Sequence, residues 1–134
     1  RARTAGGATL IDDSYNANPD SVRAAVDLLA AEASPRILVL GDMGEVGSRG
    51  AEYHREVGAY ARSRGIDTVL ATGEATRETC SAFGTGAEHH AGIEALIGRA
   101  RELAQPGATL LVKGSRFMRM ERVVTALVAA AGAH

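Results

Sequence analysis

The feature that most constrains the fold of this sequence is an alternation between short apolar segments and longer segments with helical periodicity. Short apolar runs predict buried strands at residues 8–13, 36–40, 68–71, 87–90 and 108–112. Segments with apolar residues at helical spacing predict helices at residues 20–33, 48–64, 74–83, 93–104 and 117–131. Uniformly apolar strands that alternate with helices form a parallel sheet covered on both faces. We therefore expect an α/β fold, a Rossmann-like three-layer sandwich with a mostly parallel open sheet of about five to six strands.

The first two predicted helices carry recognisable terminal residues. Asn18 is a residue type that caps helix N-termini, and Pro19 suits the first helical position, where its missing N–H costs nothing. Gly65 follows the second helix and suits the left-handed conformation in which many helices end. These residues predict where both helices begin or end.

The composition is that of one globular domain. The chain has 134 residues, of which 46% are hydrophobic, and its formal net charge is −1. Near-neutral charge gives no general attraction to nucleic acid or anionic membranes, and no apolar run approaches the roughly 18 residues that span a bilayer. Cys80 is the single cysteine, so an intrachain disulfide is impossible. We expect a monomeric, cytoplasmic protein that binds neither nucleic acid nor membrane.

In open parallel sheets ligands bind beyond the carboxyl ends of the strands, so the turns after three predicted strands are the candidate sites. The first turn is DDSYNANP at 12–19. A carboxylate there can accept hydrogen bonds from ribose hydroxyls, and asparagine amides both donate and accept, which suits adenine or sugar edges. The candidate nucleotide-binding residues are Asp13, Tyr15, Asn16 and Asn18. Taken alone, Ser14 and Asn18 are better explained as a turn residue and a helix cap.

The second turn is GDMGEVG at 41–47, whose glycines do not follow the dinucleotide-binding fingerprint. Asp42 and Glu45 would repel a phosphate, so we exclude a phosphate cradle here. An acidic turn suits an ammonium group or a basic partner domain. The alternative is that the two acids favour the dipole of the following helix and the glycines form a tight turn. His54 lies further along that helix, where a lone histidine is more often structural or solvated.

The third turn, KGSR, is basic and begins the last predicted helix. Lys113 and Arg116, with Ser115 between them, would converge with backbone N–H groups on a carboxylate or phosphate. Arg119 and Arg122 follow at three-residue intervals, and for these two a solvated basic helix face is the better interpretation. The third turn therefore predicts an anion site.

Other catalytic and metal-binding patterns are weak or missing. No G-x-x-x-x-G-K-[ST] loop occurs, so the chain has no P-loop of its own. Glu88, His89 and His90 are adjacent, but neighbouring histidines on a strand point to opposite faces, which disfavours a metal site. Cys80 is better explained as a small core residue than as a nucleophile. We expect neither a metal site nor a catalytic residue in this chain.

Taken in this order, the three turns resemble the C-terminal domain of the Mur ligases, the ATP-dependent ligases of cytoplasmic peptidoglycan precursor synthesis. The matching segments are DDSYNANPDS at 12–21, VLGDMGEVG at 39–47, HREVG at 54–58 and LVKGSRFMRMERVV at 111–124. Together they span nearly the whole chain. The first turn is most similar to that of the family member that adds D-alanyl-D-alanine to a UDP-linked tripeptide.

The resemblance implies a three-domain enzyme of which this chain, residues 1–134, is the third domain. The first domain, for UDP-N-acetylmuramoyl-tripeptide, and the central ATPase domain, with the P-loop, Mg²⁺ ligands and a carbamylated lysine, would lie outside this chain. ATP would activate the tripeptide carboxylate as an acyl phosphate, which the amine of D-alanyl-D-alanine would attack, leaving ADP and phosphate. This domain would close over the nucleotide through a hinge just upstream of residue 8. Alone, it should show no ligase activity and weak ATP affinity.

The resemblance also assigns residues to ligands. The stretch near ribose and adenine in the family corresponds here to Asp13, Tyr15, Asn16 and Asn18. The segment near the incoming amino component corresponds to Lys113, Ser115 and Arg116. A separate hypothesis, independent of the resemblance, is that Asp42 and Glu45 meet the ammonium group of the dipeptide.

Three alternatives remain open. A sister Mur ligase that adds a single amino acid shares the architecture, although the YNANP segment argues for the dipeptide-adding enzyme. A Rossmann-like binding module with no catalytic partner would use the same turns as ligand sites only. A nucleotide-dependent oxidoreductase domain is disfavoured because the dinucleotide fingerprint is missing.

Overall fold

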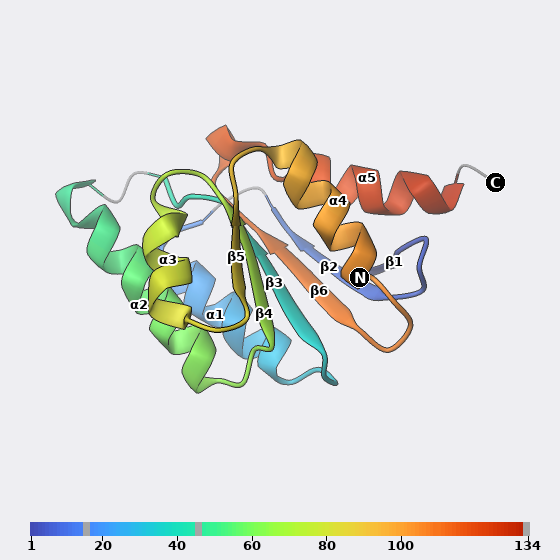
Figure 1. Cartoon of the computed structure of the whole chain (residues 1–134), viewed down its shortest axis with the longest axis horizontal. Coiled ribbons are helices and arrows are strands. Elements are labelled where there is room, and N and C mark those ends of the chain that lie inside the picture. Colours follow the sequence, from blue (N-terminus) through green and yellow to red (C-terminus); the bar gives the residue numbers. More distant parts are fainter. Residues whose placement is uncertain (15–16, 45–46, 133–134) are drawn as a thin grey trace.

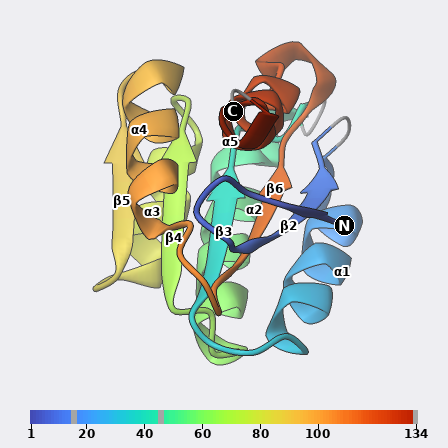
Figure 2. The same cartoon turned by 90° about the vertical axis from the view of Figure 1, so that its right-hand side faces the viewer.

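A six-stranded sheet forms the centre of the protein, between two groups of helices in Figure 1 and with its strands side by side in Figure 2. The computed structural model describes residues 1–14, 17–44 and 47–132, without the side chains of residues 116 and 129–132. In chain order the strands are β1 (Ala2–Arg3), β2 (Thr9–Asp13), β3 (Arg36–Leu40), β4 (Thr68–Thr72), β5 (Ala87–His90) and β6 (Thr109–Lys113). Their order in the sheet is β1-β2-β6-β3-β4-β5, and every neighbouring pair is parallel except β1 with β2.

Helices cover both faces of the sheet (Figures 1 and 2). They are α1 (Pro19–Ala30), α2 (Gly50–Ser63), α3 (Thr76–Phe83), α4 (Ile93–Leu103) and α5 (Glu121–Gly132). Leu38 of β3 packs into a core shared with α1, α2 and α3, whereas its neighbours Ile37 and Val39 pack into a second core with α4 and α5. Because successive strand residues face opposite sides, a strand buried on both faces must be apolar throughout. The predicted α/β fold and three-layer architecture are confirmed.

The predicted start of the first helix and the predicted end of the second are confirmed, whereas the first helix ends at Ala30, three residues before its predicted end. The Asn18 side chain accepts a hydrogen bond from the Ser21 N–H at 2.9 Å, and the Ser21 hydroxyl accepts one from the Asn18 N–H at 3.0 Å, with Pro19 as the first helical residue. This reciprocal pair satisfies two N–H groups at the helix start. Gly65 follows α2 with a φ of +79°, a conformation that residues with a Cβ rarely adopt.

The prediction for the last helix was wrong at its start. A short 3-10 turn, η2 (Arg116–Met118), comes first, and Arg119 has a φ of +53° before α5 begins at Glu121. The turn lets Met120 enter the core, where it is fully buried. A Cβ built on Gly41 or on Gly114 would lie 2.9 or 2.3 Å from the Met120 side chain. Met120 thus fills a space that two glycines leave open, and the chain must bend to place it there.

Strand β1 was not predicted at all. Its two residues are exposed and pair antiparallel with the start of β2, so they carry none of the apolar pattern that signals a buried strand. No helix in the described part of the chain is long and apolar enough to cross a membrane.

Candidate functional site

The strand order brings the three predicted turns to one edge of the sheet. Strand β6 lies between β2 and β3, and Lys113, its last residue, pairs with Asp13 of β2 and with Leu40 of β3. The turns after β2, β6 and β3 therefore emerge side by side at the carboxyl ends of parallel strands. Such an edge is where open α/β sheets bind ligands.

A buried ion pair joins the first and third turns. Lys113 Nζ lies 3.0 Å from Asp13 Oδ2, and the side chain of Lys113 is 3% exposed while that of Asp13 is 34% exposed. A buried ammonium group is costly unless an opposite charge lies close, so Asp13 stabilises Lys113 in this position. The remaining exposed surface of Asp13 keeps its carboxylate accessible to a ligand from solvent.

Ser115 presents a polar group without a partner. The residue is buried, and its N–H donates to the Asp42 carbonyl at 3.2 Å. Its hydroxyl oxygen is buried and has no hydrogen-bond partner among the described residues. Leaving a buried hydroxyl unsatisfied costs about 1–3 kcal/mol, so such a group is expected at a site that a ligand completes.

Asp42 has a structural task in the described geometry. Its two carboxylate oxygens accept hydrogen bonds from the backbone N–H groups of Thr76 at 2.9 Å and Ala75 at 3.2 Å. The carboxylate therefore stabilises the N-terminus of α3, a different helix from the one that follows its own turn. Gly73 leaves room for it, because a Cβ there would lie 2.3 Å from Asp42 Oδ1. Each oxygen can accept a further hydrogen bond, so its predicted contact with an ammonium group stays a prediction.

The remaining predicted residues are placed as follows. Tyr15, Asn16 and Glu45 lie outside the described residues, as does the side chain of Arg116. Asn18 is at the same edge, with its side-chain oxygen engaged in capping α1. In the same turn, Asp12 accepts hydrogen bonds from the N–H and the hydroxyl of Ser14. Their ligand contacts stay predictions.

The two adjacent histidines, His89 and His90, and the cysteine take structural positions elsewhere. His89 Nε2 is hydrogen-bonded to the Gly73 carbonyl, and His90 Nε2 lies 3.2 Å from Glu88 Oε1. In the described ranges no three His, Cys, Asp or Glu side chains group closely enough to hold a metal ion. Partial burial raises the pKa of the Cys80 thiol, which disfavours the reactive thiolate.

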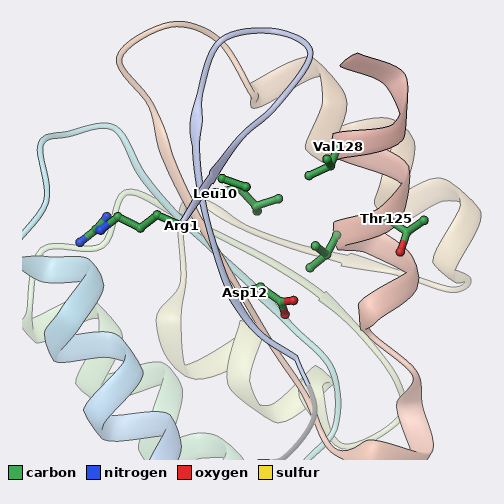
Figure 3. Close-up of a pocket in the computed structure, with 7 residues that line it drawn as sticks. Arg1, Leu10, Asp12, Thr125 and Val128 are labelled. Atoms are coloured by element: carbon green, nitrogen blue, oxygen red, sulfur yellow. The ribbon is translucent and has the colours of Figure 1, made fainter. Parts of the chain in front are cut away.

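A separate cavity lies against the other face of the sheet (Figure 3). Its volume is about 550 Å³, and its lining residues are Arg1, Ala2, Leu10, Asp12, Val124, Thr125 and Val128. Leu10 belongs to the core beneath α4 and α5, whereas Leu111, two positions before Lys113 on the same face of β6, belongs to the core beneath α1. None of the predicted ligand-binding residues whose side chains the structure describes lines this cavity, so the cavity is distinct from the buried pair Lys113–Asp13 and from Ser115.

Comparison with known families agrees with this geometry. The sequence profile described as "Mur ligase, glutamate ligase domain" matches residues 1–116, which include β2, β3 and β6 with the starts of their turns. This chain belongs to the Mur ligase family. The matched residues carry the three turns at the carboxyl edge of the sheet.

The curated relatives that the chain matches are longer than it is. It is 48% identical over 120 residues to the UDP-N-acetylmuramoyl-tripeptide–D-alanyl-D-alanine ligase of Escherichia coli K12, matching 88% of this chain and 26% of the relative. A crystal structure of MurF from Acinetobacter baumannii superposes with a TM-score of 0.78 at 30% identity, over 88% of this chain and 27% of that one. The MurF ligase of Thermotoga maritima in complex with ADP shares the fold, with a TM-score of 0.80 at 20% identity, over 98% of this chain and 32% of that one. The chain spans about a quarter of the length of the curated relatives it matches.

His54 and Met120 are residues of the site whose importance the sequence did not reveal. Both lie within segments that matched the family pattern, at HREVG and at the end of the third turn. Both are fully buried and contact the second turn. The available signal was that His54 and Met120 lie in helical segments whose neighbouring residues are mostly charged.

Proposed function

We propose that this Mur ligase domain is the C-terminal domain of the enzyme that joins D-alanyl-D-alanine to UDP-N-acetylmuramoyl-tripeptide with hydrolysis of ATP. The observation that carries the proposal is the grouping at the carboxyl edge of buried Lys113 with the Ser115 hydroxyl, which has no hydrogen-bond partner among the described residues. The 48% identity to the Escherichia coli ligase, which bears that activity in its name, supports the choice within the family. In this proposal the reaction takes place in the cytoplasm, and the domain acts as part of a monomeric enzyme.

The dipeptide carboxylate is the anion that we assign to the third turn. Ser115 supplies a hydroxyl donor, and Lys113 supplies positive charge, with two ammonium protons beyond the one directed at Asp13. Arg116 is the second cation of this subsite by sequence position. In the same proposal Asp42 and Glu45 lie near the dipeptide ammonium group, opposite in charge to it. This arrangement would hold the dipeptide at both ends while its amine attacks.

ATP is the ligand that we assign to the first turn. Asp13 keeps a third of its side chain exposed and can accept hydrogen bonds from ribose hydroxyls, with Tyr15, Asn16 and Asn18 beside it in sequence. The structural relative from Thermotoga maritima holds ADP, which supports a nucleotide as the shared ligand class. The phosphates and Mg²⁺ would be held by the central domain, since the sequence has no P-loop.

The division between domains has a chemical reason. An acyl phosphate hydrolyses when water reaches it, and a site closed between two domains excludes water. A domain that carries only the dipeptide and ribose contacts therefore cannot catalyse by itself. Formation of an amide bond by residues 1–134 alone would contradict this assignment.

A titration of this chain followed by NMR tests the two sites separately. D-alanyl-D-alanine should shift the amide signals of residues 113–116, and ATP should shift those of residues 13–18, with L-alanyl-L-alanine as the stereochemical control. The Ser115→Ala variant should fold as well as the parent, because the hydroxyl makes no hydrogen bond to any described residue. It should bind the dipeptide several-fold more weakly, by about the 0.5–1.5 kcal/mol that one hydrogen bond contributes.

If the isolated domain binds neither ligand, the same variant is measured in the complete ligase. There Ser115→Ala should raise the KM for the dipeptide and leave that for ATP unchanged. If the parent ligase and the Ser115→Ala variant had the same KM for the dipeptide, the assignment of the dipeptide to the third turn would be refuted.

A further inference from the structure

We propose that His54 is a positioning residue that holds the second turn against the third turn and thereby sets the place of Ser115. His54 lies on α2 and is fully buried. Its ring contacts the backbone of Met43, two residues into the second turn, at a hydrogen-bond distance of 3.0 Å. No role in ligand binding is needed for this function, because His54 would act through the turn.

The ring nitrogens of His54 have fixed donor and acceptor roles. Nδ1 lies 2.6 Å from the carbonyl oxygen of Gly50, which can only accept, so Nδ1 carries the proton. Nε2 receives the N–H of Met43, so Nε2 carries none. The geometry therefore specifies one neutral tautomer, with the proton on Nδ1. A side chain without an acceptor at this place would leave the buried N–H of Met43 unpaired.

The second turn transmits this position to the third turn. The Asp42 carbonyl accepts the Ser115 N–H at 3.2 Å, and the Gly41 N–H donates to the Lys113 carbonyl at 2.9 Å. Gly44 packs closely as well, because a Cβ built there would lie 3.2 Å from both Ser115 Cβ and a ring carbon of Phe117. The residues on either side of Met43 are therefore in contact with the third turn.

The ring of His54 links α2 to the second turn, and the backbone carbonyl of His54 links α2 to α3. The Thr79 hydroxyl of α3 donates to the His54 carbonyl at 2.8 Å. Removing that hydroxyl would weaken the packing of α2 on α3 without changing the ring of His54. Thr79→Val is therefore the matched control, since valine is nearly isosteric with threonine.

Two substitutions at His54 separate its two hydrogen bonds. In His54→Asn the amide group lies where Nδ1 was, so the contact with Gly50 is kept and the acceptor for Met43 is lost. In His54→Gln the amide oxygen reaches the place of Nε2 and can still accept from Met43. If His54 positions the turn, the asparagine variant should be affected much more than the glutamine variant.

Hydrogen exchange and ¹⁵N NMR on this chain test the proposal without any ligand. We expect wild-type His54 to show the Nδ1–H tautomer, and His54→Asn to exchange the Met43 amide about tenfold faster and to shift the Ser115 amide. His54→Gln and Thr79→Val should leave both amides near their wild-type behaviour. An Nε2–H tautomer in the wild type, or an unchanged Ser115 amide in His54→Asn, would overturn the proposal; the tautomer measurement holds even if a variant fails to fold.

A second measurement rests on the proposed function. In the complete ligase, His54→Asn should raise the KM for D-alanyl-D-alanine about five- to tenfold with a smaller change in kcat, and His54→Gln should restore most of it. Equal effects of His54→Asn and Thr79→Val on this KM would indicate general destabilisation and reject positioning. If the dipeptide proves not to bind at the third turn at all, the proposed function fails while the exchange measurement still decides the role of His54.

Discussion

Two ion pairs of this domain each join a basic side chain to a carboxylate, but they differ in how far the basic side chain is exposed to water. At the carboxyl edge Lys113 pairs with Asp13 at 3.0 Å, and the lysine is almost wholly buried. At the outer edge Arg99 of α4 pairs with Glu88 of β5 at 3.0 Å, and both side chains are about one third exposed (37% and 34%). Water stabilises the charges of the outer pair when they separate, but it cannot reach the lysine of the inner pair. A buried charge that pairs with one carboxylate among the described residues is therefore placed where a ligand is expected.

The largest effect should come from removing Asp13. In Asp13→Asn the Lys113 ammonium stays buried without an opposite charge, which costs about 3–5 kcal/mol in fully buried pairs. Because Asp13 is one third exposed, we expect a loss of about 2–3 kcal/mol in the free energy of unfolding. Lys113→Met should cost less, since the carboxylate left behind can be hydrated. Urea denaturation of both variants tests the asymmetry, and equal losses would show that the pair is more hydrated than its geometry indicates.

A smaller effect is expected from Asp42. In Asp42→Ala the N–H groups of Ala75 and Thr76 lose their acceptor at the start of α3, which should cost about 1–2 kcal/mol, as for other helix caps. Thermal unfolding followed by circular dichroism measures this loss. A variant as stable as the parent would mean that water replaces the carboxylate, and the case for a mainly structural Asp42 would fail.

The outer pair should contribute little. Arg99, by hydrogen bonding and charge, and to a smaller extent His90 lower the pKa of the Glu88 carboxyl. A lowered pKa in the folded state gives stability that is present above the unfolded-state value of about 4.3 and is lost as the pH falls below it. Glu88→Gln should therefore cost under about 1 kcal/mol at pH 7, and the cost should shrink as the pH falls through the lowered folded-state pKa of Glu88. A larger loss at pH 3 than at pH 7 would contradict the assignment.

The smallest effect on stability, and the sharpest contrast with Asp13, should come from Ser115. Its hydroxyl has no partner within the described residues, so Ser115→Ala should change the free energy of unfolding by less than about 0.5 kcal/mol or even raise it. Urea denaturation beside the Asp13→Asn variant makes the comparison. A clear loss of stability would show that the hydroxyl is bonded in solution.

Residue patterns predicted most of the fold because burial leaves a local mark. The segments at 37–40 and 110–112 are apolar throughout since both faces of their strands are covered, and Asn18 with Pro19 specifies a helix start within a few residues. The two-residue strand β1 and the turn before α5 left no such mark. The first is exposed, and the second exists because Met120 must reach a space between Gly41 and Gly114, which are distant in sequence.

For the site, the sequence by itself determined the chemical groups and the turns that carry them. Charged and amide side chains directly after buried strands are visible in the order of residues, and the family resemblance rests on the same segments. Only the tertiary structure decided which groups meet. The strand order that places β6 between β2 and β3 pairs Lys113 with Asp13, directs Asp42 to α3, and leaves the Ser115 hydroxyl without a partner in the part of the chain that the structure describes. Strand order depends on packing between segments far apart in the chain, and no local pattern records it.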